Sequence, residues 1–273
     1  MTASPGVPLN DGVEIPQLGF GVFQIEPSDT VETVSRALEV GYRHVDTAAA
    51  YGNETEVGEA VRAFGEHVFV TTKCFNFDHG LADAKAAFGA SFKRLGLDHV
   101  DLYLIHWPVP SRDLYVDTWK AFVELRESGS VRSIGVSNFQ ADHLARIVDE
   151  TGVTPSVNQV ELHPYLQQAE LRREHAGRGI VTQAWSPLAQ GKVLDDQVIV
   201  DIGAAHGKSA GQVVLRWHLQ LGNVVFPKSA TPERIQANFD IFDFSLTEEE
   251  MSAIEGLDRG ERIGPDPDTF VAP

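Results

Sequence analysis

Cysteine is nearly missing from this chain, since only Cys74 is found among its 273 residues. A single cysteine cannot form a disulfide within the chain, which is typical of proteins kept in a reducing compartment. No apolar run approaches the roughly 18 consecutive residues that a membrane-spanning helix needs. The first residues, up to Gly12, lack the basic stretch and apolar stretch of a signal peptide. We therefore expect a cytoplasmic protein that does not enter a membrane.

Positive charge is also scarce. Lys and Arg number 22 against 39 Asp and Glu, which gives a formal net charge of -17. Nucleic acid and anionic membranes both attract basic surfaces, so neither is expected as a partner. Any anion-binding site would have to be a local group of basic residues. The remaining composition, 42% hydrophobic and 22% charged, is that of a globular protein with a large core.

Short β-rich runs alternate with helical patterns along the chain. The pair Asp11-Gly12 predicts a hairpin turn near residues 9–13. Strands are predicted at 17–22, 43–46, 67–73, 100–106, 131–136, 156–160, 180–184 and 224–227. Helices are predicted at 30–40, with Ser28 as its N-cap, and at 54–64, 81–95, 115–128, 141–149, 169–178, 197–206, 210–221, 232–239 and 247–255.

Eight β/α units over about 250 residues are typical of a closed (β/α)8 TIM barrel. The alternative is an open doubly wound sheet, but no Gly-x-Gly-x-x-Gly follows any predicted strand and no linker divides the chain. We predict one α/β domain over residues 1–273. It is a TIM barrel with an N-terminal β-hairpin and extra helices near the C-terminus.

Polar side chains stand at the end of almost every predicted strand. These endings are Gly21 to Phe23, Asp46, Lys73, His106, Ser137 and Asn138, Gln159 to Glu161, Trp185 and Ser186, and Lys228 and Ser229. In a TIM barrel the carboxyl ends of the strands carry the active site. The sequence therefore predicts a polar mouth above an apolar barrel.

Asp46, Lys73 and His106 end three consecutive predicted strands, and Tyr51 follows on the loop after Asp46. Each alone has an ordinary interpretation as a helix cap, a surface charge or a packed aromatic. Together they suit proton donation to a developing alkoxide. A free tyrosine has a pKa near ~10, and an ammonium about 4 Å away favours the tyrosinate, so Lys73 is predicted to lower the pKa of Tyr51. Asp46 would keep Lys73 protonated, and neutral His106 would orient the carbonyl oxygen.

Three separated blocks of sequence resemble a known family. They are Gly41-Tyr42-Arg43-His44-Val45-Asp46-Thr47-Ala48 followed by Tyr51-Gly52-Asn53-Glu54, then Gly135-Val136-Ser137-Asn138-Phe139, then Pro227-Lys228-Ser229 with Arg234 and Asn238. In this order they resemble the aldo-keto reductases, and among these the bacterial 2,5-diketo-D-gluconic acid reductases and their relatives that reduce small aldehydes. The resemblance implies a catalytic tetrad of Asp46, Tyr51, Lys73 and His106. It also implies hydride transfer from NADPH to a carbonyl carbon.

The resemblance further implies where NADPH would lie. Ser137, Asn138 and Gln159 would hold the carboxamide, Trp185 would stack on the nicotinamide ring, and Ser186, Leu188, Gln190 and Gly191 would line the pyrophosphate. Lys228, Ser229 and Arg234 would bind the 2′-phosphate with Asn238 near the adenine, and Gly21, Val22, Phe23 and Ala230 complete the predicted cofactor set. In so acidic a chain, a Lys, a hydroxyl and an Arg at the start of one helix form the basic group that an extra phosphate needs. A solvated helix face is the alternative.

The predicted substrate wall is apolar and consists of Phe23, Ala50, Phe75 and Trp107. Phe75 stands where the family commonly has Trp, and Cys74 where it commonly has Leu, which affects substrate size rather than the chemistry. Cys74 is expected to point into packing, because neighbouring side chains on a strand alternate. His163 is expected to serve a turn. The short tail beyond Leu257 is predicted to be a partial lid that orders when the cofactor binds.

Two other functions fit parts of this pattern. A Schiff-base lyase would use Lys73 as a nucleophile, but it needs a lysine of lowered pKa and leaves the basic residues at 228–234 unexplained. A regulatory barrel that binds a nucleotide without turnover would have no use for four converging residues. We expect no metal site, a small carbonyl substrate as the partner, and a monomer.

Overall fold

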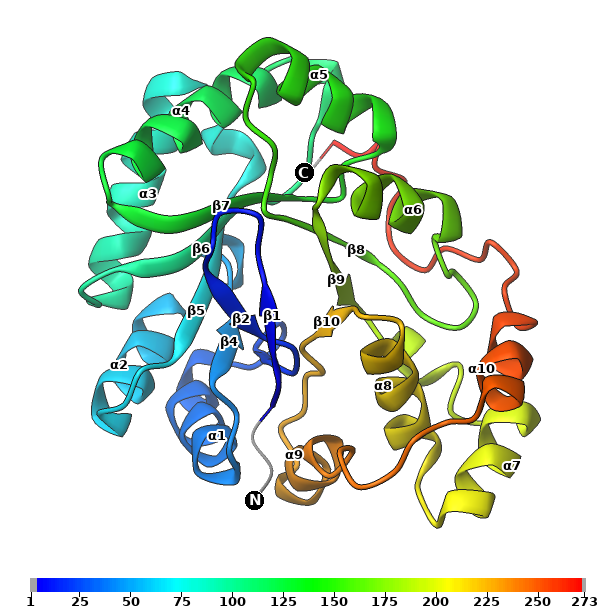
Figure 1. Ribbon diagram of the computed structural model, residues 1–273. Coiled ribbons are helices and arrows are strands. Elements are labelled where there is room, and N and C mark those ends of the chain that lie inside the picture. Colours follow the sequence, from blue (N-terminus) through cyan, green and yellow to red (C-terminus); the bar gives the residue numbers. More distant parts are fainter. Residues whose placement is uncertain (1–3, 272–273) are drawn as a thin grey trace.

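The computed structural model describes residues 4–271 and contains one sheet of eight parallel strands, in the order β10-β9-β8-β7-β6-β5-β4-β3. The strands are β3 (Phe20–Gly21), β4 (His44–Asp46), β5 (Phe69–Cys74), β6 (Val100–Ile105), β7 (Val131–Ser137), β8 (Val157–Glu161), β9 (Val181–Trp185) and β10 (Val224–Val225). The two edges meet, because Val225 N donates to Gln17 O (2.9 Å) and Gly19 N donates to Val225 O (2.7 Å). The predicted (β/α)8 barrel is confirmed (Figure 1).

The predicted hairpin is also present, as β1 (Gly6–Pro8) paired antiparallel with β2 (Glu14–Pro16). Its turn contains Gly12 at φ 86°, a conformation that glycine adopts without strain. Leu9 and Ile15 are buried in one cluster with apolar residues from β5, β6, β8 and β10. In Figure 1 the hairpin lies in front of the barrel centre. It therefore covers the amino ends of the strands and leaves the other end for the site.

The helices form a ring outside the sheet (Figure 1). They are α1 (Pro27–Val40), α2 (Glu54–Phe64), α3 (Leu81–Leu95), α4 (Tyr115–Glu127), α5 (Ala141–Thr151), α6 (Ala169–Arg178), α7 (Gln197–His206), α8 (Ala210–Gln220), α9 (Pro232–Phe239) and α10 (Glu248–Glu255). Two helices stand between β9 and β10, and two more follow β10, so the predicted extra helices are confirmed. Among the described residues, no helix has both the length and the apolar character to cross a bilayer.

The predicted start of the first helix is wrong. α1 begins at Pro27 with Glu26 as its N-cap, and the hydroxyl of Ser28 lies within the first turn, 3.2 Å from Asp29. Proline suits the first helical position because its missing N–H would have no intrahelical acceptor there. Ser28 therefore does not cap this helix.

Candidate active site

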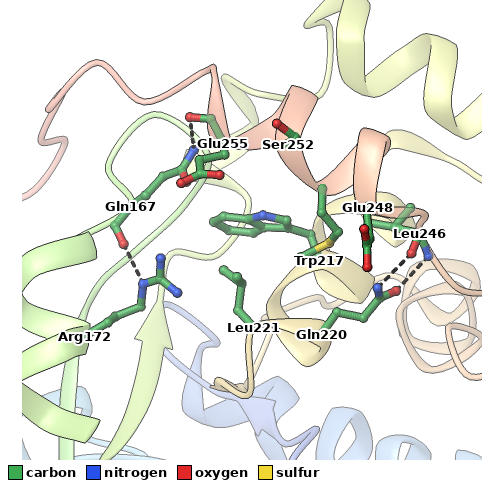
Figure 2. A pocket seen from close by; sticks show the side chains of 10 residues that line it. Gln167, Arg172, Trp217, Gln220, Leu221, Leu246, Glu248, Ser252 and Glu255 are labelled. Atoms are coloured by element: carbon green, nitrogen blue, oxygen red, sulfur yellow. Dashed lines mark hydrogen bonds between the residues drawn. The ribbon is translucent and has the colours of Figure 1, made fainter. Parts of the chain in front are cut away.

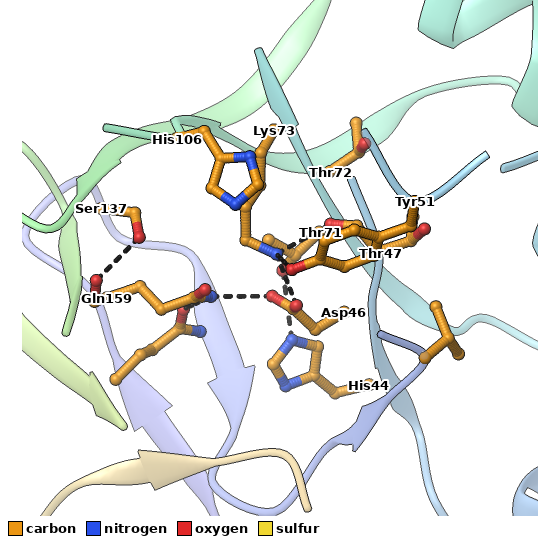
Figure 3. Close-up of polar contacts among 12 residues, drawn as sticks. His44, Asp46, Thr47, Tyr51, Thr71, Thr72, Lys73, His106, Ser137 and Gln159 are labelled. Atoms are coloured by element: carbon orange, nitrogen blue, oxygen red, sulfur yellow. Dashed lines mark hydrogen bonds and ion pairs between the residues drawn. The ribbon is translucent and has the colours of Figure 1, made fainter. Parts of the chain in front are cut away.

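The predicted catalytic residues meet at the carboxyl ends of β4, β5 and β6. Asp46 is the last residue of β4, Lys73 lies near the end of β5, and His106 directly follows β6. Tyr51 ends the short 3-10 helix η1 (Ala49–Tyr51) that comes after β4. Because these strands are parallel neighbours, their carboxyl ends share one end of the barrel. Figure 3 shows the four side chains side by side.

Lys73 is the centre of this group. Its Nζ donates to Asp46 Oδ1 (2.5 Å), to the backbone oxygen of Thr47 (2.8 Å) and to the Tyr51 hydroxyl (3.4 Å). An ammonium has three protons, so all of its donors have an acceptor. The Lys73 side chain has no exposed surface and Asp46 is 2% exposed. The ammonium is thus fixed against the phenol.

A second layer of hydrogen bonds fixes Asp46. Its Oδ2 accepts from Gln159 Nε2 (2.8 Å), which also donates to Gln183 Oε1 (3.0 Å). Gln159 comes from β8, across the barrel from β4, and its own backbone oxygen accepts from Ser137 Oγ (2.8 Å). Figure 3 shows this connection between opposite walls. Two residues predicted to hold the cofactor are therefore joined to the catalytic group.

Burial is the largest single influence on the pKa of Lys73, Asp46 and His106. It lowers the pKa of Lys73, but the Asp46 carboxylate and Tyr51 outweigh it, so the net pKa lies above the ordinary lysine value. Burial raises the pKa of Asp46, although Lys73 and Gln159 favour the carboxylate. Burial, with the Lys73 ammonium as the next cause, lowers the pKa of His106 to about 3. His106 is therefore neutral at physiological pH, as predicted.

The predicted pKa shift of Tyr51 is wrong in its net direction. Burial raises the pKa of the phenol, and the Lys73 ammonium opposes that rise without cancelling it. Desolvation disfavours tyrosinate, and the distance-based argument from sequence left that cost out. The phenol is thus a hydroxyl that keeps its proton at neutral pH.

The residues predicted for the nicotinamide lie beside the catalytic group. Asn138 Nδ2 donates to the backbone oxygen of His106 (3.0 Å) and to Ser137 Oγ (3.1 Å). Asn138 Oδ1 accepts from the indole nitrogen of Trp185 (2.8 Å). The Trp185 side chain is therefore held at its pyrrole edge.

Backbone strain gathers at the same rim. Asn138, Ser186 and Gln190 have φ of 63°, 49° and 54°, the left-handed region that favours glycine. Gln190 lies in the 3-10 helix η4 (Ala189–Gly191), which follows Leu188 and ends at Gly191. Non-glycine residues in such conformations gather at functional sites. All three belong to the predicted cofactor set.

The residues predicted to bind the 2′-phosphate lie where β10 leads into α9. Lys228, Ala230 and Arg234 are exposed, whereas Ser229 is buried and its Oγ accepts from Thr231 N (3.1 Å). Asn238 is half-buried on α9. In the part of the chain that the structure describes, Lys228 and Arg234 form no ion pair, so their charges can serve an anion.

Gly21, on the first strand of the barrel, has no room for a side chain, because a Cβ there would lie 2.6 Å from the Phe226 backbone oxygen.

The predicted substrate residues follow the carboxyl ends of β3, β4, β5 and β6. The Phe23 ring is 54% exposed and 5.0 Å from the Tyr51 ring, and Val22 beside it is buried. Ala50 is exposed on η1 and Phe75 packs against Phe77 at 5.5 Å. The Trp107 ring lies 4.5 Å from Phe270 and 6.3 Å from Trp185. The apolar wall therefore includes Phe270, a tail residue that the sequence reasoning did not select.

Two expectations beside the site are confirmed. Cys74 is fully buried, and burial raises the pKa of its thiol to about 12, as suits a packing residue. His163 forms an isolated antiparallel bridge with Leu166, and so takes part in a turn. Its Nε2 lies 3.1 Å from Glu161 Oε1, and Glu161 in turn accepts from two tail amides. Glu161 is a residue that the prediction from sequence missed, and its place at the polar end of a strand is the signal that points to it.

A cavity of about 310 Å³ lies elsewhere, among α6, α8 and α10. Figure 2 shows Trp217, Leu221 and Glu255 in its lining. None of the predicted site residues lines it. The catalytic group at the strand ends is the better candidate.

Comparisons with known proteins show the family of this chain. The model of the "Aldo/keto reductase family" matches residues 17–259. The chain is 56% identical to an aldo-keto reductase of Mycolicibacterium smegmatis over 98% of both chains, and 51% identical to the methylglyoxal reductase DkgA of Escherichia coli over 97% of both. A mutant of Gox0644 crystallised with NADPH superposes with a TM-score of 0.97 at 46% identity, covering 99% of this chain and 100% of that one. The chain therefore belongs to the aldo/keto reductase family of oxidoreductases.

Proposed function

We propose that this protein uses NADPH to reduce small aldehydes, dicarbonyls and keto-sugar acids to alcohols, with Tyr51 as the general acid. The observation that carries the proposal is the Lys73 ammonium, bound at once to Asp46, Thr47 and the Tyr51 hydroxyl. The relative named methylglyoxal reductase supports a small dicarbonyl substrate, and the NADPH complex of Gox0644 supports the cofactor.

NADPH, when bound, supplies the hydride that adds to the carbonyl carbon. As negative charge builds on the carbonyl oxygen, Tyr51 transfers its phenolic proton to that oxygen. Its raised pKa keeps the proton available at neutral pH. The Lys73 ammonium, 3.4 Å away, then stabilises the tyrosinate that remains. Neutral His106 orients the oxygen by a hydrogen bond, since it carries one N–H and no charge.

The residues at the rim fit this cofactor. Ser137, Asn138 and Gln159 present hydrogen-bonding groups for a carboxamide next to the tetrad, and Trp185 presents an indole ring. The exposed Lys228 and Arg234 supply positive charge in a chain of net charge -17. A phosphate on the adenosine ribose would need such charge, so NADPH is preferred over NADH in this proposal.

The electrostatics weigh against the lyase. Schiff-base formation starts from a neutral amine, and the net pKa of Lys73 lies above the ordinary value. Trapping of substrate on Lys73 with borohydride would support the lyase instead. A regulatory barrel would show quenching of tryptophan fluorescence by NADPH without turnover of any carbonyl.

The direct test is a panel of methylglyoxal, simple aldehydes and keto-sugar acids, followed by the loss of NADPH absorbance. Tyr51→Phe keeps the ring and removes the proton, so reduction should fall by roughly 10²- to 10⁴-fold while NADPH still binds. Near-normal turnover by Tyr51→Phe would exclude the proposed acid. Lack of turnover by the native protein on the whole panel would count against the reductase itself.

We also propose that residues 1–273 act as one domain and as a monomer in the cytoplasm. The single cysteine supports a reducing compartment. Light scattering at the mass of a dimer would contradict the monomer.

A further inference from the structure

Glu161, the last residue of β8, is a buried carboxylate held largely by the C-terminal tail. Its side chain has no exposed surface. Oε1 accepts from Ile263 N (2.6 Å) and Oε2 from Gly264 N (3.0 Å), and the Arg262 guanidinium lies 3.6 Å from Oε2. A carboxylate is expensive to bury without such partners. Burial raises its pKa, but the hydrogen bonds from His163, Ile263 and Gly264 outweigh that effect and leave the pKa below its ordinary value.

The tail that Glu161 holds presses on Trp185. Glu161 and Trp185 are register partners on β8 and β9. Gly264 has no room for a side chain, since a Cβ there would lie 2.4 Å from the outer edge of the Trp185 ring. The opposite edge of the same ring donates to Asn138 (2.8 Å). The indole is therefore fixed between Asn138 on one side and the tail on the other.

Further contacts keep the tail along this rim. Arg259 N and Glu261 N both donate to the Tyr165 backbone oxygen (3.1 and 3.0 Å), and the Arg259 guanidinium lies 3.9 Å from the Tyr165 ring centre. Farther along, Phe270 packs on Trp107. These contacts with Tyr165 and Trp107 do not involve the Glu161 carboxylate. A change at Glu161 should therefore loosen the middle of the tail without releasing all of it.

We propose that Glu161 is a positioning residue for Trp185, acting through residues 262–264 of the tail. The inference rests on the proposed function, in which Trp185 stacks on the nicotinamide. By holding Gly264 against the ring, Glu161 fixes the indole in the orientation that receives the cofactor. Its influence on NADPH affinity therefore passes through Trp185.

Glu161→Gln removes the charge and one acceptor with little change in size. We expect the tail to open more often, so that trypsin cleaves faster after Arg259 and Arg262 in the absence of cofactor. The dissociation constant for NADPH, measured by fluorescence titration, should rise at least about tenfold. Glu170→Gln is the matched control, because the Glu170 side chain is exposed on α6, away from the tail, and its ion-pair partner is Arg173 at 3.8 Å. It should match the native protein in both measurements.

The route through Trp185 is tested by a double-mutant cycle. In a Trp185→Ala background, Glu161→Gln should still speed cleavage of the tail but should not weaken NADPH binding further. Gly264→Ala adds a methyl group at the ring edge on a half-buried stretch of the tail, and should also raise the NADPH dissociation constant. Gly264→Ala tests the contact between the tail and Trp185 if Glu161→Gln does not fold.

Two results would overturn the inference. One is faster tail cleavage in Glu161→Gln with unchanged NADPH affinity, which would make Glu161 a structural anchor only. The other is an equal loss of affinity with and without Trp185. Failure of the proposed function is distinguishable, because the native protein would then reduce no carbonyl of the panel, while the trypsin and NADPH-binding comparisons would still report on the tail and on Trp185.

Discussion

Lys73 is a lysine without exposed surface whose ammonium is nevertheless stabilised. Each of its protons has an acceptor, and one acceptor is the Asp46 carboxylate at 2.5 Å. A buried amine without these partners would lose its proton. Asp46 therefore acts on Tyr51 through Lys73. In the proposed function, proton donation, charge stabilisation and positioning fall to three different residues, although all three lie within one hydrogen-bonded group.

In the proposed function the choice of cofactor also depends on single residues. Arg234→Ala should raise the dissociation constant of NADPH about tenfold to a hundredfold, because a charge-assisted hydrogen bond to the 2′-phosphate is worth roughly 1.5–3 kcal/mol. NADH lacks that phosphate, so its binding should hardly change. Fluorescence titrations with both cofactors measure the effect, and Arg173→Ala, an exposed arginine on α6, is the control. An equal loss for both cofactors would place the phosphate elsewhere.

At the scale of elements, Asn53 joins the loops that carry the site. Its Oδ1 accepts from Thr47 Oγ1 (2.9 Å), and its Nδ2 donates to the backbone oxygens of Val22 (3.1 Å) and Ile25 (3.3 Å). Asn53 is fully buried. It thus connects the loop after β3 with the loop that leads from β4 to Tyr51.

Asn53→Ala should lower the free energy of unfolding by about 1–3 kcal/mol, because two backbone oxygens and one hydroxyl lose their partner. Turnover should fall too, since Phe23 and Tyr51 lie on the two loops that Asn53 joins. Urea unfolding and steady-state assays measure the two effects. Asn53→Asp keeps the acceptor for Thr47 but turns a buried carboxylate oxygen toward two backbone oxygens, so it should destabilise the protein at least as much as Asn53→Ala. Native stability in Asn53→Ala would show that the loops hold without it.

The sequence predicted most elements because periodicity and turn residues are local properties. It misplaced the start of α1, where Pro27 suits the first turn better than Ser28 suits the cap. The catalytic group was predictable because its members end neighbouring strands, so the topology alone brings them together. Contacts set by tertiary structure were not predictable. The pKa of Tyr51 depends on burial, and Glu161 meets Ile263 across 102 residues of chain.

At the scale of the whole molecule, buried histidines couple folding to pH. Burial is the first cause of a lowered pKa in each of five: His44, His106 and His218, with values of about 3, and His79 and His175, with values of about 4. They come from the barrel interior, the site and the helical layer, so the effect belongs to the fold as a whole. All five are neutral in the folded protein at pH 7.

Acid should therefore destabilise this protein well above the pH at which carboxylates titrate. A histidine has a pKa near 6.5 in the unfolded chain, so below that pH the unfolded state binds more protons than the folded state. The stabilising contribution is complete above pH 6.5 and is lost as the pH falls toward the folded values. At pH 5 such a histidine contributes up to about 2 kcal/mol less to stability than at pH 7, from about 1.4 kcal/mol per pH unit, and all five act in the same direction. The free energy of urea unfolding should thus drop steeply between pH 7 and pH 5. His175→Gln should make the slope shallower than in the native protein, because it removes one of these buried rings. Equal stability at pH 7 and pH 5 would mean that these rings are not held neutral by burial.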